Sequence, residues 1–201
     1  IGENRKNQID VANDTSRYKL ILFAWPLIQF FLLFGSLISI CWFKHLTVLE
    51  AVILMLVQGM ITGAVGITFA HELMHQKTKL ERFLADVLMA MAFYGHFRTE
   101  HVFVHHRYVG TKKDAVTARF NESFYIFFLR VIPQCFISAW SVEAQKLATK
   151  NKSTFNMANP FYTYAALASL FVLLSFIIGG TYGITLFFIQ ALVAILHLEV
   201  V

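Results

Sequence analysis

The chain has 201 residues, of which 57% are hydrophobic and only 14% charged, and its formal net charge is +5. These proportions are far from the charge-rich composition of soluble domains, so they exclude an ordinary water-soluble fold. The expected surroundings are a lipid bilayer, and we expect no nucleic-acid partner.

Four stretches are long and apolar enough to cross a bilayer, whose hydrocarbon core requires about 20 residues of helix. They are residues 20–43, 46–70, 161–178 and 184–201. The first has no charged side chain, and the second is interrupted only by Glu50. The sequence therefore predicts an all-α polytopic membrane protein, with about four spans in a single domain over residues 1–201.

The remaining segments are expected to lie at one membrane face. Residues 71–122 form a histidine-rich region, and residues 123–140 are apolar but contain Arg130 and Pro133. We expect the second segment to be an interfacial or re-entrant helix.

Lysine and arginine residues precede the first span and follow the second. By the positive-inside rule both flanks are cytoplasmic, so the first two spans form a hairpin whose tip near Lys44 faces outward. The glycine-rich run at residues 179–183 predicts the tip of a second hairpin. The histidine-rich region then faces the cytoplasm.

The second span contains Gly59-x-x-x-Gly63 followed by Gly66. Small residues at this spacing allow two helices to approach closely. The alternative is that these glycines face lipid, since glycine is frequent in spanning helices.

The two ends of the sequence indicate a piece of a longer protein. The chain begins with Ile1 instead of methionine, and Val201 stands inside a hydrophobic run. We therefore expect part of the functional site to lie outside this chain.

Histidines are concentrated far beyond an even spread. Six of the eight fall between residues 71 and 106: His71, His75, His96, His101, His105 and His106. His71 and His75 are four apart, so on a helix they share one face, and His101 and His105 repeat this spacing. His106 would lie about 100° around the helix from His105, which suits a second metal ion. Buried polar groups at a membrane need partners. We therefore predict a metal centre formed by His71, His75, His101, His105 and His106.

Other functions use similar patterns. His-Glu-Leu-Met-His is also the zinc-protease pattern, in which the glutamate is the general base. A catalytic zinc uses three protein ligands, so this reading leaves the later histidines unexplained. Imidazole sites with open positions suit iron, which can activate dioxygen. A metal transporter is a further alternative, although transporters bind their cargo near the bilayer midplane and these motifs follow the spans.

Three motifs in order, HELMHQKTKLERFLA, YGHFRTEHVFVHH and VGTKKDAVTARFNESFYIFFLR, resemble the integral-membrane alkane monooxygenases. These belong to the wider family of membrane desaturases and hydroxylases. The resemblance implies two non-haem iron ions, dioxygen as co-substrate, and electrons from rubredoxin for the hydroxylation of the terminal carbon of alkanes. It also implies a bacterial inner membrane with the active site on the cytoplasmic side.

Carried over to this sequence, the resemblance makes His71, His75, His101, His105 and His106 iron ligands. The family's remaining histidines come from two further boxes that this chain does not contain. Gln76 and Val104 depart from the usual motifs, so the substrate stays open. The alternatives are a xylene or other aryl-methyl monooxygenase and a fatty acyl desaturase or hydroxylase.

Residues near the boxes are predicted to support the ligands through hydrogen bonds. They are Glu72, Glu100, His96, Asp114, Arg119 and Glu122. Alternatively, the two glutamates beside the ligands face water, the Asp114, Arg119 and Glu122 side chains pair with one another, and His96 serves packing.

Overall fold

The computed structural model describes residues 11–200, and this part of the chain is helical without any β-strand, which confirms the predicted all-α class. Arg5, Lys6 and Val201 lie outside the described residues. The α-helices are α1 (Val11–Phe43), α2 (Val48–Ile61), α3 (Ile67–Met74), α4 (Lys79–Met91), α5 (Phe97–Glu100), α6 (His106–Tyr108), α7 (Phe124–Ala148) and α8 (Phe161–Val200). Two π-helical segments, η1 (Thr62–Gly66) and η2 (His101–His105), connect α2 to α3 and α5 to α6.

Four helical stretches in the described residues are long and apolar enough to cross a membrane: Tyr18–Phe43, Val48–Met74, Phe124–Ala148 and Phe161–Val200. Many of their large apolar side chains are exposed, among them Phe31, Leu49 and Leu173. A surface of this kind is costly in water and suited to lipid.

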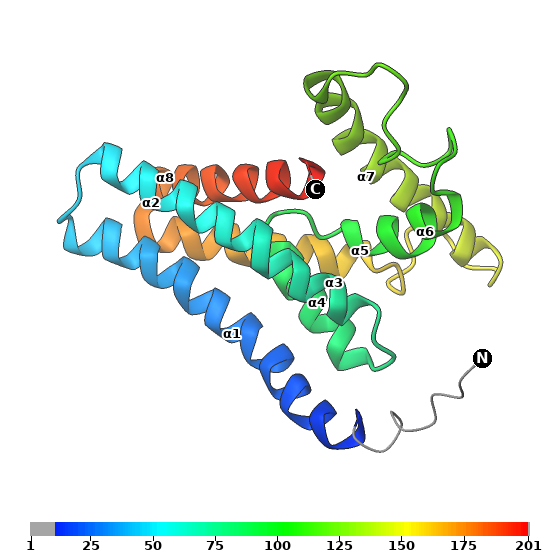
Figure 1. Cartoon of the computed structure of the whole chain (residues 1–201), viewed down its shortest axis with the longest axis horizontal. Coiled ribbons are helices and arrows are strands. Elements are labelled where there is room, and N and C mark those ends of the chain that lie inside the picture. Colours follow the sequence, from blue (N-terminus) through cyan, green and yellow to red (C-terminus); the bar gives the residue numbers. More distant parts are fainter. Residues whose placement is uncertain (1–10, 201) are drawn as a thin grey trace, which may run out of the picture.

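Helix α8 reverses direction at Gly179 and Gly180, so its 40 residues form two antiparallel halves. Gly180 has a φ of 60°, a left-handed conformation that glycine adopts without steric cost. A Cβ atom on Gly183 would collide with the backbone of Ser175, so the two halves lie side by side. Figure 1 shows the red C-terminal half running back beside α2.

The turn between α1 and α2 and the reversal within α8 lie at the same end of the molecule. The indole nitrogen of Trp42, at the end of α1, donates to the carbonyl oxygen of Ile178 at 2.9 Å. Glu50 lies at this end too, where it closes a capping box with Thr47 at the start of α2. Figure 1 places both reversals on the left, and α3, α5 and α6, which contain or adjoin the histidines of the two motifs, on the right.

The glycines of α2 and η1 are packing positions. A Cβ on Gly59 would lie 2.6 Å from the carbonyl oxygen of Gln190, and one on Gly63 would lie 2.8 Å from Cβ of His197, both in the second half of α8. Gly66 faces the side chain of Gln29 in α1. These contacts support the helix-packing interpretation over the lipid-facing alternative.

Replacing Gly59 with leucine should therefore separate α2 from α8. We expect the free energy of unfolding to fall by about 1–3 kcal/mol, the usual cost of overpacking, as measured by equilibrium unfolding of the full-length protein in mixed micelles. Gly35→Leu is the matched control, because a Cβ on Gly35 meets nothing within 4 Å. Equal effects of the two substitutions would contradict the packing role.

Helix α7 differs from the expected segment 123–140. It continues through Pro133 to Ala148, because proline removes one backbone hydrogen bond while the flanking turns remain. Its described neighbours are chiefly α5, η2 and α8, and Figure 1 draws it to the right of the C-terminal end of α8, outside the bundle. An interfacial position for α7 stays a prediction.

Candidate metal centre

The first histidine pair lies at the end of a long continuous helical run. The backbone N–H of Ile67 donates to Thr62, an i to i+5 bond that defines η1, and α3 then continues to Met74. His71 lies in this last helix and His75 caps it, with their ring centroids 4.7 Å apart. The predicted pairing of these two histidines is observed.

The second histidine motif forms a π-helix, and this changes which side chains face one another. The N–H of His106 donates to the carbonyl of His101, five residues earlier. On an α-helix these two residues would be about 140° apart. In the wider turn of η2 they meet, with Nε2 of His101 3.0 Å from Nε2 of His106. The predicted neighbours His101 and His105 also lie together, with stacked rings whose centroids are 5.4 Å apart.

Four histidines from the two motifs form a closed ring. The centroid distances are 4.6 Å between His71 and His101, 4.5 Å between His101 and His106, and 4.9 Å between His106 and His75. One nitrogen from each ring lies within 4.8 Å of the others. Bonds of about 2.1 Å place opposite ligands about 4.2 Å apart. Small rotations of the rings would therefore let all four bind one ion, and the donor set fits a divalent transition metal.

The charge state of the rings also suits a metal. Burial and the neighbouring imidazoles lower the pKa of His101 to about 3, and the same causes lower the pKa of His106. Both rings are therefore neutral at physiological pH. A neutral imidazole keeps the lone pair that a metal requires, so binding costs no deprotonation.

His105 lies outside this group of four, and Asp114 holds its ring. Nδ1 of His105 is 2.9 Å from Oδ2 of Asp114, whose side chain is fully buried. Asp114 also accepts from the backbone N–H of Val116 and the hydroxyl of Thr117. With the proton on Nδ1, Nε2 of His105 is free to bind a metal, which is a common way for a carboxylate to orient a ligand. Its role as a ligand stays a prediction.

Asp114→Leu should remove the acceptor that holds His105. We expect metal affinity to fall by about 10- to 100-fold, the usual cost of losing such a supporting group. Asp114→Asn keeps an oxygen that can accept from the ring, so it should retain most of the affinity. Metal titration of both full-length variants tests this expectation, and an unchanged affinity in Asp114→Leu would contradict it.

The two glutamates beside the ligands have different surroundings. Glu72 is partly buried and accepts from Nε2 of Gln76 at 2.8 Å. Glu100 is completely buried, and neither of its oxygens has a hydrogen-bond partner among the described residues. Burial, helped by the negative charges of Asp114 and Glu199, raises the pKa of Glu100 to about 8. Whether either glutamate orients an imidazole stays a prediction.

The run Asp114, Arg119 and Glu122 does not form the ion pairs suggested as an alternative. Glu122 pairs with Arg130 of α7, through two guanidinium nitrogens each 2.7 Å from a carboxylate oxygen. This pairing, with the backbone N–H of Arg119 next in importance, lowers the pKa of Glu122 to about 2. Arg130 also donates to the carbonyl of Ala115, so it ties the loop after the histidines to α7.

Two polar contacts were not predicted from the sequence. The hydroxyl of Tyr94 donates to Glu199 at 3.1 Å, and that of Thr99 donates to Glu143 at 3.0 Å. A carboxylate within the apolar sequence LHLEVV was the available signal for Glu199, because ionisable residues in such stretches mark functional sites. His96 lies apart from the four-histidine ring, between the rings of Tyr94 and Phe136.

Comparison with known proteins agrees with this arrangement. The family model of fatty acid desaturases matches residues 47–201, which include both histidine motifs and most of the bundle. The chain belongs to the fatty acid desaturase family. The resemblance to membrane desaturases and hydroxylases is thereby confirmed.

Individual relatives within this family are oxygenases. Alkane 1-monooxygenase 2 of Alcanivorax borkumensis is 32% identical over 143 residues, which are 71% of this chain and 37% of the relative. Alkane 1-monooxygenase 1 of Pseudomonas aeruginosa is 38% identical over 144 residues, with the same coverage of both chains. The xylene/toluene monooxygenase hydroxylase component of Pseudomonas putida is 33% identical over 127 residues, or 62% of this chain and 34% of the relative. The chain thus spans little more than a third of the length of these relatives.

Proposed function

We propose that this chain is part of a membrane oxygenase that hydroxylates the terminal carbon of medium- or long-chain alkanes to give primary alcohols. The ring formed by His71, His75, His101 and His106 carries the proposal, because it offers four imidazoles to one metal at the end of a lipid-facing bundle. The similarity to alkane 1-monooxygenases supports the substrate class.

The proposed cofactors are two non-haem iron ions, with dioxygen as co-substrate. When bound, the irons would supply the oxidising power needed to break an unactivated C–H bond. Four histidines would hold one ion, and His105, with its ring fixed by Asp114, would contribute to the other. The rest of the protein would place the carbon to be hydroxylated and exclude water.

The electron donor is proposed to be rubredoxin, and the membrane is proposed to be the bacterial inner membrane with the histidines on the cytoplasmic side. A single cysteine at Lys112 in a cysteine-free background should then resist labelling by an impermeant reagent in intact cells. A cysteine at Lys44 should be labelled. Labelling at Lys112 from outside would contradict the topology.

Product analysis tests the reaction. Membranes that contain the full-length protein would receive octane, hexadecane or xylene together with ¹⁸O₂ and reductant. We expect 1-octanol or 1-hexadecanol that contains ¹⁸O. Oxidation of xylene alone would contradict the alkane substrate and favour an aryl-methyl monooxygenase. A desaturated fatty acyl product would favour a fatty acyl desaturase. Metal transport without oxygen consumption would contradict an oxygenase altogether.

A further inference from the structure

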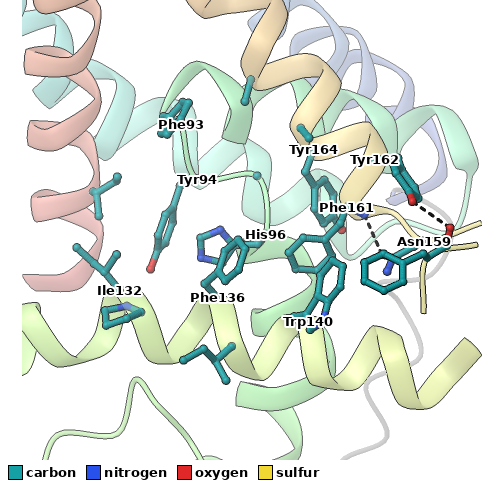
Figure 2. A pocket seen from close by; sticks show the side chains of 17 residues that line it. Phe93, Tyr94, His96, Ile132, Phe136, Trp140, Asn159, Phe161, Tyr162 and Tyr164 are labelled. Carbon is teal, nitrogen blue, oxygen red and sulfur yellow. Dashed lines mark hydrogen bonds between the residues drawn. The ribbon is translucent and has the colours of Figure 1, made fainter. Parts of the chain in front are cut away.

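A large apolar cavity is lined by none of the four histidines of the metal centre. Its volume is about 890 Å³, within the range of small-molecule sites. It lies between α7 and the first half of α8, and the 93–96 loop forms one wall (Figure 2). Aromatic side chains such as Phe136, Trp140 and Phe161 surround it, and none of the lining residues carries a formal charge at neutral pH.

Most polar side chains of this cavity already have partners. The hydroxyl of Tyr164 is bonded to Thr99, that of Tyr162 to the carbonyl of Phe155, and both amide atoms of Asn159 bond to nearby backbone. Tyr94 is bonded to Glu199. An occupant therefore finds few free hydrogen-bonding groups on these residues.

Among the lining residues that the structure describes, His96 has a buried polar atom without a partner, and the partly buried indole N–H of Trp140 also has none. The buried atom of His96 is Nε2. The imidazole ring is fixed between Tyr94 and Phe136, with centroid distances of 4.5 and 5.3 Å. Leaving a buried polar atom without a partner costs free energy that a suitable ligand would recover.

We propose that this cavity binds a single-chain primary alcohol, with the alkyl chain among the aromatic side chains and the hydroxyl group on His96. The cavity supplies a large apolar surface, a neutral buried imidazole and the indole N–H of Trp140, which matches an alkyl chain with one uncharged polar end. Burial lowers the pKa of His96 to about 4, so the ring is neutral and can pair with a hydroxyl group. A carboxylate is disfavoured, because no lining residue supplies a positive charge. The proposal concerns binding alone and does not depend on the proposed hydroxylation.

The test uses a dodecan-1-ol probe with a photoreactive diazirine in its chain, added to the full-length protein in phosphatidylcholine nanodiscs. After irradiation, mass spectrometry identifies the labelled peptides, and unlabelled dodecan-1-ol, dodecane and dodecanoate serve as competitors. We expect labelling of the cavity walls around residues 132–140 and 161–168. Dodecan-1-ol should compete best.

Two pairs of variants separate the contributions of shape and hydrogen bonding. Ala165→Trp fills the cavity and should abolish labelling, whereas Ala166→Trp, at a neighbouring position outside the lining, should leave it unchanged. His96→Phe keeps a ring but removes the polar atom, so dodecan-1-ol should compete about fivefold more weakly, as expected for one neutral hydrogen bond. His96→Asn keeps a neutral donor and acceptor and should restore part of the difference.

Three results would overturn the proposal. The first is equal labelling of the Ala165→Trp and Ala166→Trp variants. The second is competition by dodecane as strong as that by dodecan-1-ol, with no effect of His96→Phe. The third is stronger competition by dodecanoate at neutral pH. Because the readout is labelling, these results are independent of whether the enzyme hydroxylates alkanes.

Discussion

Alanine at any one of the four ring histidines should abolish hydrocarbon turnover in the full-length protein and lower its metal content. The four are His71, His75, His101 and His106, whose nitrogens lie within 4.8 Å of one another. Removing one ligand opens the coordination sphere and leaves the other imidazoles without their shared partner. We expect turnover to fall by at least about 100-fold, at the upper end of what loss of a supporting residue alone costs.

The matched controls are histidines outside the two motifs. His45 is exposed in the loop between α1 and α2, at the opposite end of the bundle, and its replacement should leave both measurements unchanged. His197 packs against Gly63, so His197→Ala should affect stability more than metal content. Full metal content in all four ring variants would contradict the site.

Asp86→Leu should cost the largest amount of stability. Asp86 in α4 accepts from two guanidinium nitrogens of Arg98 in α5, and the exposed fractions of the two side chains are only 5% and 16%. Burial raises the pKa of Asp86 even though Arg98 acts in the opposite direction, which shows how strongly this position disfavours an unpaired charge. Loss of the aspartate leaves Arg98 charged and buried, at a cost of about 3–5 kcal/mol.

A double variant isolates the unpaired charge as the cause. Asp86→Leu combined with Arg98→Met removes both charges, so part of the lost stability should return. Equilibrium unfolding of the two single variants and the double variant measures this coupling. If the double variant loses as much stability as the two single variants together, the pair does not anchor α5, the helix that leads directly into η2.

Much of the fold follows from the sequence, because lipid imposes simple rules. Long apolar runs must be helical in a bilayer, and the glycines at residues 179–183 allow the chain to reverse. The spacing of Gly59 and Gly63 likewise indicated a contact that the structure places against α8. The length of α7 was not predicted, since proline and arginine end a hydrophobic pattern more readily than they end a helix.

The site was predictable in its residues but less so in its geometry. The spacing predicts the proximity of His101 and His105, whose rings are stacked 5.4 Å apart, but it does not predict that the π-helix also brings His101 to His106 or that His105 contacts Asp114. A π-helical turn of this kind depends on the tertiary contacts of the segment and produces no periodic pattern in the sequence. The partner of Glu122 was also hidden, because Arg130 belongs to another helix and contacts of that kind require the fold.

The most direct test of the metal centre is elemental analysis of the purified full-length protein combined with X-ray absorption spectroscopy at the metal edge. The proposal predicts iron as the bound metal, with nitrogen and oxygen ligands and the outer-shell scattering of several imidazoles. That scattering should weaken in His101→Ala, which removes an imidazole that contacts histidines of both motifs. Stoichiometric zinc without iron, or a spectrum that lacks imidazole scattering, would contradict it.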